Sequence, residues 1–197
     1  MTRLLALLLV ATTASAQTAP APLPPVAEQV AAAVLPLPAE LRAGAAIMGY
    51  KTAGKLEELR PGSNGMICLA LYVTRPDFHV ACYHKGLEPF MARGRELREQ
   101  GVRSLNAVDS VRYREIAEGK LKMPKYGALY SLTGNKTVWD PTKGTASGAM
   151  PLSVVYMPFA TPEETGLSTQ PKRTSEPWLM FPGTAKAHIM LVGTMAP

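Results

Sequence analysis

"NGMICLALYVTRPDFHVACYH", residues 64–84, contains both cysteines of the 197-residue chain and two of its three histidines. Two runs rich in apolar residues flank the segment "TRPD", whose composition is typical of a turn. If the runs pair as antiparallel strands centred on Arg75, Cys68 and Cys82 lie directly opposite each other. Facing side chains in neighbouring strands are close enough to form a disulfide. The stretch therefore predicts a disulfide-linked hairpin.

Two other roles for the cysteines fit their spacing less well. A redox pair normally has the spacing C-x-x-C, and structural zinc sites use steps of C-x₂₋₄-C. An exported chain, in contrast, meets an oxidising compartment in which paired cysteines persist as disulfides. In the chain-entropy model, closing a loop of about 15 residues contributes on the order of 3 kcal/mol. The spacing and the expected compartment both favour a structural disulfide.

The first 16 residues have the layout of a secretory signal peptide. Arg3 precedes the apolar run 4–10, and Ala14-Ser15-Ala16 forms an A-x-A cleavage site. The run is much shorter than the roughly 20 apolar residues that span a bilayer, and no later stretch is long and apolar enough. We therefore predict a bacterial protein that is periplasmic or secreted and has no transmembrane segment after cleavage.

The basic residues are spread along the chain rather than gathered in one place. The formal net charge is +6, but Arg93, Arg95 and Arg98 alternate with Glu96 and Glu99. Nucleic-acid-binding proteins usually concentrate their charge in a stripe with stacking aromatic residues. The pattern indicates a solvated basic face and no nucleic-acid partner.

The chain divides into a leader, a linker and one domain. Residues 17–40 form a Pro- and Ala-rich linker, within which 26–34 has the pattern of a short helix. Residues 41–197 are long enough for a single domain with its own core. Short runs with β-branched or aromatic residues, bounded by turn residues, predict strands at 45–50, 54–62, 126–134, 152–159 and 187–193.

One segment after the hairpin has a clear amphipathic helical pattern, at 87–101. Its apolar residues recur at helical spacing, Pro89 is tolerated in the first turn, and Gly101 suits a left-handed C-cap. A second helix is predicted at 109–120, with Asp109 or Ser110 as its N-cap. The fold class is therefore α+β: a small antiparallel sheet with the disulfide-linked hairpin and one or two packed amphipathic helices.

His84, Glu88 and His188 are candidate metal ligands. Strand alternation places His79 on the opposite side from His84, so these two cannot easily share a metal. If the last strand lies beside the hairpin, His188 can approach His84 and Glu88, and two imidazoles with a carboxylate suit an open zinc or iron(II) site. Glu88 in a first helical turn also interacts favourably with the helix dipole without any metal. Both interpretations stay open.

Two long connections, 134–151 and 160–177, are rich in Gly, Thr, Ser and Pro. Connections of this length are uncommon in compact domains unless they are functional or mobile. Aromatic residues lead at binding interfaces, so those in and beside these connections are the candidate anchors for a ligand: Trp139, Tyr156, Phe159 and Trp178.

Several segments together resemble a family of uncharacterised secreted bacterial proteins. The matching stretches are "LRPGSNGMICLA", "VACYH", "ALYSLTG", "WDP" and "AHIMLV", and they cover about a third of the chain after the leader. The resemblance implies that Asn64, Cys68, Cys82 and His188 fill particular structural or binding places, and it implies no activity. This chain departs from the family in its longer helical middle and in Ala187, which replaces a proline. Asn-Gly at 64–65 is also a favoured tight turn.

The sequence favours a non-catalytic exported protein that binds a small ligand or a partner in the cell envelope and needs no cofactor. It contains no G-x-S-x-G, Walker or G-x-G-x-x-G motif in a suitable context. The alternative is a hydrolase that uses one divalent zinc or iron ion, held by His84, Glu88 and His188. A purely structural envelope component is the third interpretation.

Overall fold

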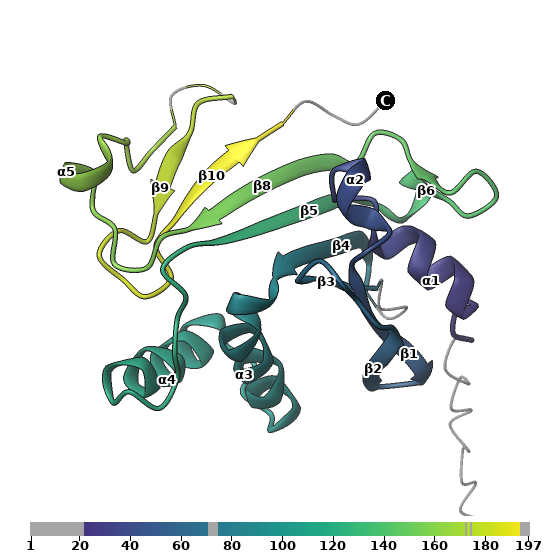
Figure 1. Cartoon of the computed structure of the whole chain (residues 1–197), viewed down its shortest axis with the longest axis horizontal. Helices are drawn as coiled ribbons and strands as arrows, with labels where there is room; N and C mark the ends of the chain where they lie inside the picture. Colours follow the sequence, from purple (N-terminus) through teal and green to yellow (C-terminus); the bar gives the residue numbers. More distant parts are fainter. Residues whose placement is uncertain (1–21, 71–74, 172, 174, 194–197) are drawn as a thin grey trace, which may run out of the picture.

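The computed structural model describes residues 22–70, 75–171, 173 and 175–193. The predicted leader and the first residues of the linker lie outside these ranges. Within them, eight strands form one sheet in the order β2-β1-β3-β4-β5-β8-β10-β9 (Figure 1). The strands are β1 (Ala46–Thr52), β2 (Lys55–Arg60), β3 (Met66–Leu69), β4 (Asp77–His84), β5 (Gly127–Asn135), β8 (Met150–Tyr156), β9 (Trp178–Met180) and β10 (His188–Val192).

Helices and a small second sheet surround this central sheet. The helices are α1 (Val26–Ala33), α2 (Ala39–Arg42), α3 (Glu88–Glu99), α4 (Leu105–Ala117) and α5 (Pro162–Thr165), with 3-10 turns η1 (Lys85–Leu87) and η2 (Lys136–Val138). The second sheet pairs β6 (Trp139–Asp140) with β7 (Thr145–Ala146). None of the helices in the described ranges is both long and apolar enough to cross a membrane.

The hairpin predicted from the sequence is present as β3 and β4. Cys68 faces Cys82 in the antiparallel register, and the two sulfurs are joined at 2.05 Å. The preceding Asn64-Gly65 turn depends on glycine, because Gly65 has a φ of +79°. The Asn64 Oδ1 accepts a hydrogen bond from the Met66 N–H at 3.1 Å. The predicted disulfide is confirmed.

The mixed fold and the mostly antiparallel sheet are confirmed, but the prediction of a small sheet is wrong. Among the described strands, β1 and β3 form a parallel pair and all other neighbours are antiparallel. The parallel pair joins the β1–β2 hairpin to the disulfide hairpin, and β8, β10 and β9 extend the other side. β9 is only three residues long, too short for a recognisable alternating pattern.

The first predicted helix is confirmed as η1 followed by α3, with Pro89 in its first turn and a φ of +90° at Gly101. The predicted start of the second helix is wrong. α4 begins at Leu105, and its N-cap Ser104 accepts a hydrogen bond from the Ala107 N–H at 3.5 Å. Asp109 lies inside the helix, where its carboxylate pairs with cations. The first turn of α4 exposes Leu105, so apolar periodicity does not reveal the true start.

α1 packs against the sheet, although the sequence places it in a linker. Ala33 and Leu37 are buried together with Cys68 and Cys82. Gln29 is 2% exposed, and its side-chain amide exchanges two hydrogen bonds of 2.8 Å with the backbone of Tyr50 in β1. Residues 26–37 are therefore part of the packed fold.

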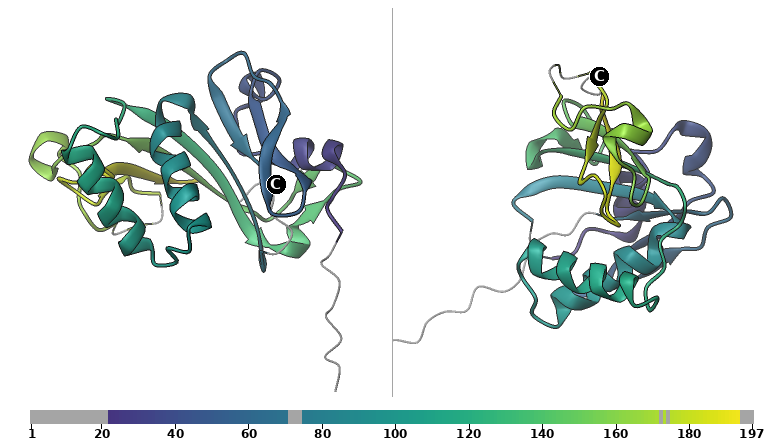
Figure 2. Two further views of the ribbon diagram at one scale, coloured as in Figure 1. Left: turned by 90° about the horizontal axis from the view of Figure 1, so that it is seen from below. Right: turned by 90° about the vertical axis from the view of Figure 1, so that its left-hand side faces the viewer.

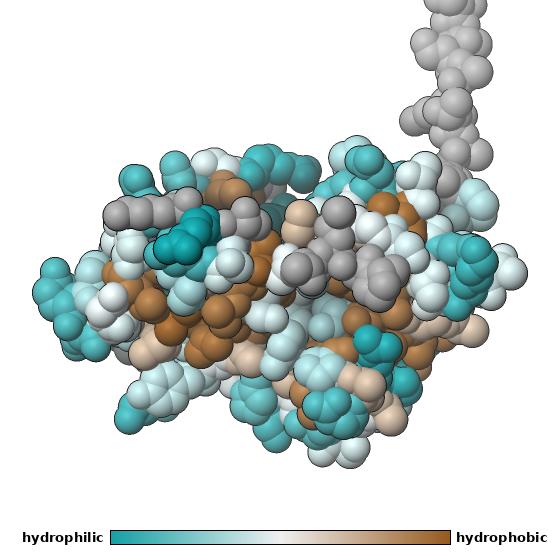
Figure 3. Space-filling view, turned by 90° about the horizontal axis from the view of Figure 1, so that it is seen from above, coloured by the Kyte–Doolittle hydropathy of each residue, from teal (hydrophilic) through white to brown (hydrophobic). Residues whose placement is uncertain are grey.

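α3 and α4 cover part of the opposite face of the sheet (Figure 2). Phe90 of α3 meets Tyr156 of β8 edge to face, with ring centroids 6.5 Å apart. The face turned away from α3 and α4 shows apolar areas between hydrophilic residues (Figure 3), and Leu191 of β10 is 39% exposed. The outer strands are thus only partly covered.

Both long connections contain regular structure. The first holds η2 and the β6–β7 pair, and the second begins with α5. α5 has a complete capping box, in which the Thr161 side chain accepts from the Glu164 N–H and the Glu164 side chain accepts from the Thr161 N–H. These bonds satisfy the first turn of α5, so this part of the connection is an ordered turn.

Candidate functional site

A cavity of about 550 Å³ opens between the β1–β2 hairpin, the β3–β4 strands and α3. We call it the basic cleft. Its apolar lining consists of Tyr50, Leu56, Leu69, Ala70, Ala81 and Leu105, and its polar lining of Arg75, His79, Arg95 and Arg98. Its volume lies within the range of about 300 to 1,000 Å³ that is typical of small-molecule sites.

Strand register explains the apolar floor of the cleft. Leu69 faces Ala81 across β3 and β4, and Tyr50 faces Leu56 across β1 and β2. Because alternate side chains point to opposite sides of a sheet, Cys82 points away from the cleft and Ala81 points into it. The strands that carry the disulfide therefore also build the floor.

Arg95 is held in place by two neighbours. Its Nη2 donates to Glu88 Oε1 at 2.5 Å, and its Nη1 donates to the Tyr83 hydroxyl at 2.9 Å. The Tyr83 hydroxyl in turn donates to Glu88 Oε2 at 2.5 Å. Burial, followed by the hydrogen bond to Glu88, raises the pKa of Tyr83 far above its usual range. Tyr83 therefore stays protonated and keeps bridging the pair.

Arg98 lies one helical turn from Arg95 and has a different environment. Its Nη1 donates to the Gly94 carbonyl at 3.0 Å, and no carboxylate in the described part of the chain forms an ion pair with it. Burial, followed by the like charge of Arg112, lowers the pKa of Arg98, and the charge of Asp109 opposes this shift. Arg98 thus adds a positive charge to the cleft wall, with no ion-pair contact from a carboxylate among the described residues.

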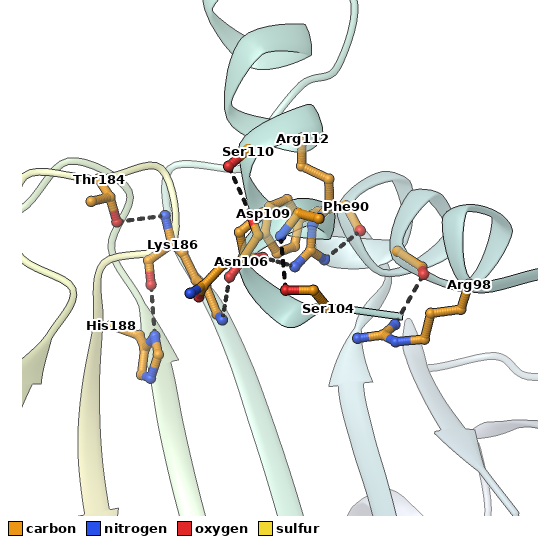
Figure 4. A network of polar contacts seen from close by, with 12 residues as sticks. Phe90, Arg98, Ser104, Asn106, Asp109, Ser110, Arg112, Thr184, Lys186 and His188 are labelled. Carbon is orange, nitrogen blue, oxygen red and sulfur yellow. Dashed lines mark hydrogen bonds and ion pairs between the residues drawn. The ribbon is translucent and has the colours of Figure 1, made fainter. Parts of the chain in front are cut away.

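A polar network behind Arg98 fixes α4 to the end of the sheet (Figure 4). Arg112 donates to the Phe90 carbonyl at 3.1 Å, stacks 3.7 Å above the Phe90 ring and pairs with Asp109. The Lys186 Nζ lies 2.9 Å from the other Asp109 oxygen. Burial opposes ionisation of Asp109, but the hydrogen bonds from Lys186 and Arg112 outweigh it and hold the pKa of Asp109 below its ordinary value.

The last polar group of the cleft is His79. Its Nδ1 lies 2.9 Å from Thr133 Oγ1 on β5. Burial, followed by the nearby charge of Arg75, lowers the pKa of His79, while Asp77 opposes this shift. The ring is therefore neutral near pH 7, and the arginines carry the positive charge of the cleft.

The structure does not bring the three candidate metal ligands together. β5 and β8 separate β4 from β10, so His84 and His188 lie about 14 Å apart at normal strand spacing. The His84 Nδ1 accepts from the Gly86 N–H at 3.2 Å, and the His188 Nδ1 lies 2.6 Å from the Lys186 carbonyl. Within the described ranges, no group of three His, Cys, Asp or Glu side chains is placed to hold a metal ion.

Three of the candidate binding residues have structural contacts. Trp139 packs on Phe78 with centroids 6.1 Å apart, and its Nε1 donates to Glu28 of α1 at 3.0 Å. Tyr156 is 6% exposed beneath α3. Asn64 holds its turn and donates to the backbone of α2 at 2.6 Å. Their contacts fit packing and turn formation.

β9, which begins at Trp178, lies at the end of the molecule opposite β6, which begins at Trp139 (Figure 1). Trp178 is half-buried in β9 opposite Met190. Phe159 is 54% exposed, has a φ of +68° and borders two cavities of about 320 Å³ each. The aromatic residues of the two connections therefore do not form one site.

The sequence contained one signal for the cleft. Arg95 and Arg98 are three residues apart on a predicted helix, a spacing that places both on the same side. Their polar alternation with glutamates is equally typical of a solvated helix face. Leu56 and Tyr50, on the other side of the cleft, belong to a hairpin about 40 residues earlier in the chain. No local sequence pattern indicates that this hairpin and the helix with the arginines lie side by side.

The chain matches no family model, no curated protein and no solved structure.

Proposed function

We propose that this protein is an exported, non-catalytic binding protein that holds a small organic ligand in the basic cleft. The observation that carries this proposal is a cavity of about 550 Å³ with an apolar floor and several converging polar groups. Concave, mostly apolar sites with a few placed polar groups are where proteins usually bind small molecules.

The chemistry of the polar groups supports binding rather than proton transfer. Arginine stays protonated throughout the biological pH range and acts only as a donor. Arg95 is further fixed by Glu88 and Tyr83, so its guanidinium is presented in one orientation. His79 is engaged at Nδ1 with Thr133. These groups are suited to hold a ligand in a defined pose.

Export is supported by the chemistry of the two cysteines. The Cys68–Cys82 disulfide is buried in the core, and such bonds persist in oxidising compartments. The leader-like first 16 residues point to the same destination. A protein in the periplasm or medium that presents a ligand-sized cleft is well placed to capture small molecules outside the cytoplasm.

The proposal is tested by locating a bound probe on the protein. We expect the neutral dye N-phenyl-1-naphthylamine to shift the backbone amide NMR signals of Leu56, Leu69 and Ala81. Ala81→Trp should fill the cleft and abolish binding. Ala117→Trp, the same change in the cavity beside Phe159, should leave it intact. Shifts confined to the surroundings of Phe159 or Trp139, or binding that survives Ala81→Trp, would overturn the proposal.

A further inference from the structure

We infer that the ligand of the basic cleft is a small amphipathic anion, whose acidic head group binds Arg98 and whose apolar body lies on the floor. This inference rests on the proposed function and adds the chemical class of the ligand. It follows from three features of the cleft: its unbalanced charge, the free edge of one guanidinium and an aliphatic floor.

The charge of the cleft is unbalanced. Among the described residues that line it, three are arginines and none is acidic. Arg75 has Asp77 at 2.9 Å and Arg95 has Glu88 at 2.5 Å, so these two charges are neutralised nearby. Arg98 has no such partner in the described ranges. An anion placed at Arg98 therefore gains attraction without competing against a resident carboxylate.

The guanidinium of Arg98 is held in place while part of it stays available. One bond fixes it, from Nη1 to the Gly94 carbonyl, and its other N–H groups have no hydrogen-bond acceptor among the described residues. Gly94 leaves room for the two guanidinium groups: a Cβ there would lie 2.9 Å from Arg112 Nη1, so Arg112 would have to shift, and 3.4 Å from Arg98 Nη1. A guanidinium that is fixed on one side and has free N–H donors on the other is suited to bind a carboxylate or sulfonate.

The two like charges near Gly94 strengthen the case for an anion. Arg112 is buried and has its own carboxylate in Asp109, whereas Arg98 is exposed and lines the cleft. Burial and then the like charge of Arg112 make the charge of Arg98 less favourable, and the attraction of Asp109 offsets them only in part. An anionic head group that pairs with Arg98 would counter both effects.

The floor determines the rest of the ligand. Leu56, Leu69 and Ala81 offer aliphatic surface, and Leu105 at the mouth is 63% exposed. A purely inorganic anion would leave this surface in water, whereas a hydrocarbon or ring system would cover it. Tyr50 is the one aromatic residue among the described lining residues. Single-stranded nucleic acid usually needs several stacking rings, so the lining favours a small amphipathic molecule.

Two dyes with the same ring system provide the test. 1-Anilinonaphthalene-8-sulfonate carries a sulfonate that the neutral N-phenyl-1-naphthylamine lacks. We expect the full-length protein to bind the sulfonate at least about tenfold more tightly by fluorescence titration at low salt, with the difference shrinking as salt rises. Arg98→Gln should weaken sulfonate binding about tenfold or more and leave the neutral dye unchanged, because it removes a charged hydrogen-bond donor.

Two sets of variants serve as controls. Arg114→Gln removes the same charge from an exposed position of α4 outside the cleft and should change neither affinity. Leu105 is exposed, so substitutions there should not impair folding. Both changes remove the same apolar side chain from the cleft mouth, so Leu105→Glu and Leu105→Lys should alter neutral-dye binding equally, whereas the sulfonate should bind up to about fivefold more weakly to Leu105→Glu than to Leu105→Lys.

The outcomes separate this inference from the proposed function. If Ala81→Trp abolishes binding of both dyes but Arg98→Gln leaves sulfonate binding unchanged, the cleft binds ligands and the inference of an anion is wrong. Equal losses for both dyes in Arg98→Gln would also overturn the inference. If Ala81→Trp affects neither dye, the cleft is not the site and the proposed function fails too.

Discussion

Removing the disulfide should destabilise the protein by about 3 to 5 kcal/mol. The perturbation is the double variant Cys68→Ala/Cys82→Ala. The bond closes a loop with a sequence separation of 14, for which the chain-entropy model gives about 3 kcal/mol. The rest comes from packing, because both cysteines are fully buried against Ala33 and Leu37 and their sulfurs leave space behind. Against a typical total stability of about 5 to 15 kcal/mol, this is a large fraction.

The burial of the disulfide determines how the experiment is done. Both cysteines are 0% exposed, so a reductant reaches the bond only when the surrounding core opens. The double variant avoids this kinetic barrier. Alanine is preferable to serine, because two buried hydroxyl groups would add their own desolvation cost. Reduced wild-type protein, prepared by unfolding with a reductant, provides a control that keeps both sulfur atoms.

The assay is urea unfolding followed by circular dichroism. With a slope of about 1 to 3 kcal/mol per molar urea, the midpoint of the double variant should fall by about 1 M or more. The midpoint of reduced wild-type protein should fall by less, because its sulfur atoms still fill the core. A loss of unfolding free energy below about 1 kcal/mol would refute the reasoning. So would a native protein whose mass shows both thiols in the reduced state.

Three further predictions concern the packing around the sheet. Asp109→Asn should lower the unfolding free energy at pH 7 by about 3 kcal/mol, because it leaves two cations without their carboxylate; Asp140→Asn, at an exposed pair, should leave the urea midpoint nearly unchanged. Folding lowers the pKa of Asp109, so its carboxylate stabilises the folded protein above the ordinary pKa of 3.8, and this stabilisation is lost as the pH falls through the acid range. The difference in unfolding free energy between wild type and Asp109→Asn should therefore shrink at acid pH. Burial raises the pKa of Tyr156 to about 12, so the unfolding free energy should fall as the pH rises from 10 towards 12. The fall should be less steep in Tyr156→Phe, and equal slopes of unfolding free energy against pH in the two proteins would contradict this. Gly127→Ala should cost about 1 to 3 kcal/mol, because the new Cβ would lie 2.8 Å from the buried Leu87 Cγ, and an unchanged thermal midpoint would argue against that contact.

The elements that the sequence predicted share a strong local signal. The β3–β4 register follows from the symmetric positions of Cys68 and Cys82 about a turn, and strand alternation places the side chains. α3 follows from a regular apolar stripe with Pro89 in its first turn and Gly101 after its end. In each case the pattern extends over about ten residues or more, so chance matches are few.

The features that the sequence missed depend on contacts between distant segments. α4 begins at Leu105 because Ser104 caps it, yet the apolar pattern of this helix is weak and Asp109 looks equally suitable as a cap. His188 lies far from His84 because two strands are inserted between β4 and β10, and strand order cannot be derived from local periodicity. Residues 26–37 look like part of a linker because they lie within the Pro- and Ala-rich stretch 17–40, although a single glutamine anchors their helix to β1.

The cleft could not be predicted for the same reason, but its floor follows from the disulfide hairpin once the sheet is known. Leu69 and Ala81 are directly adjacent in sequence to Cys68 and Cys82, and alternation sends the two pairs to opposite faces. A register slip of one residue in β4 would turn His79 and Tyr83 towards α1 and place Cys82 in the cleft. The bond between the two sulfurs holds the strands in one register. It therefore fixes the floor on which the proposed ligand lies, although neither cysteine lines the cleft.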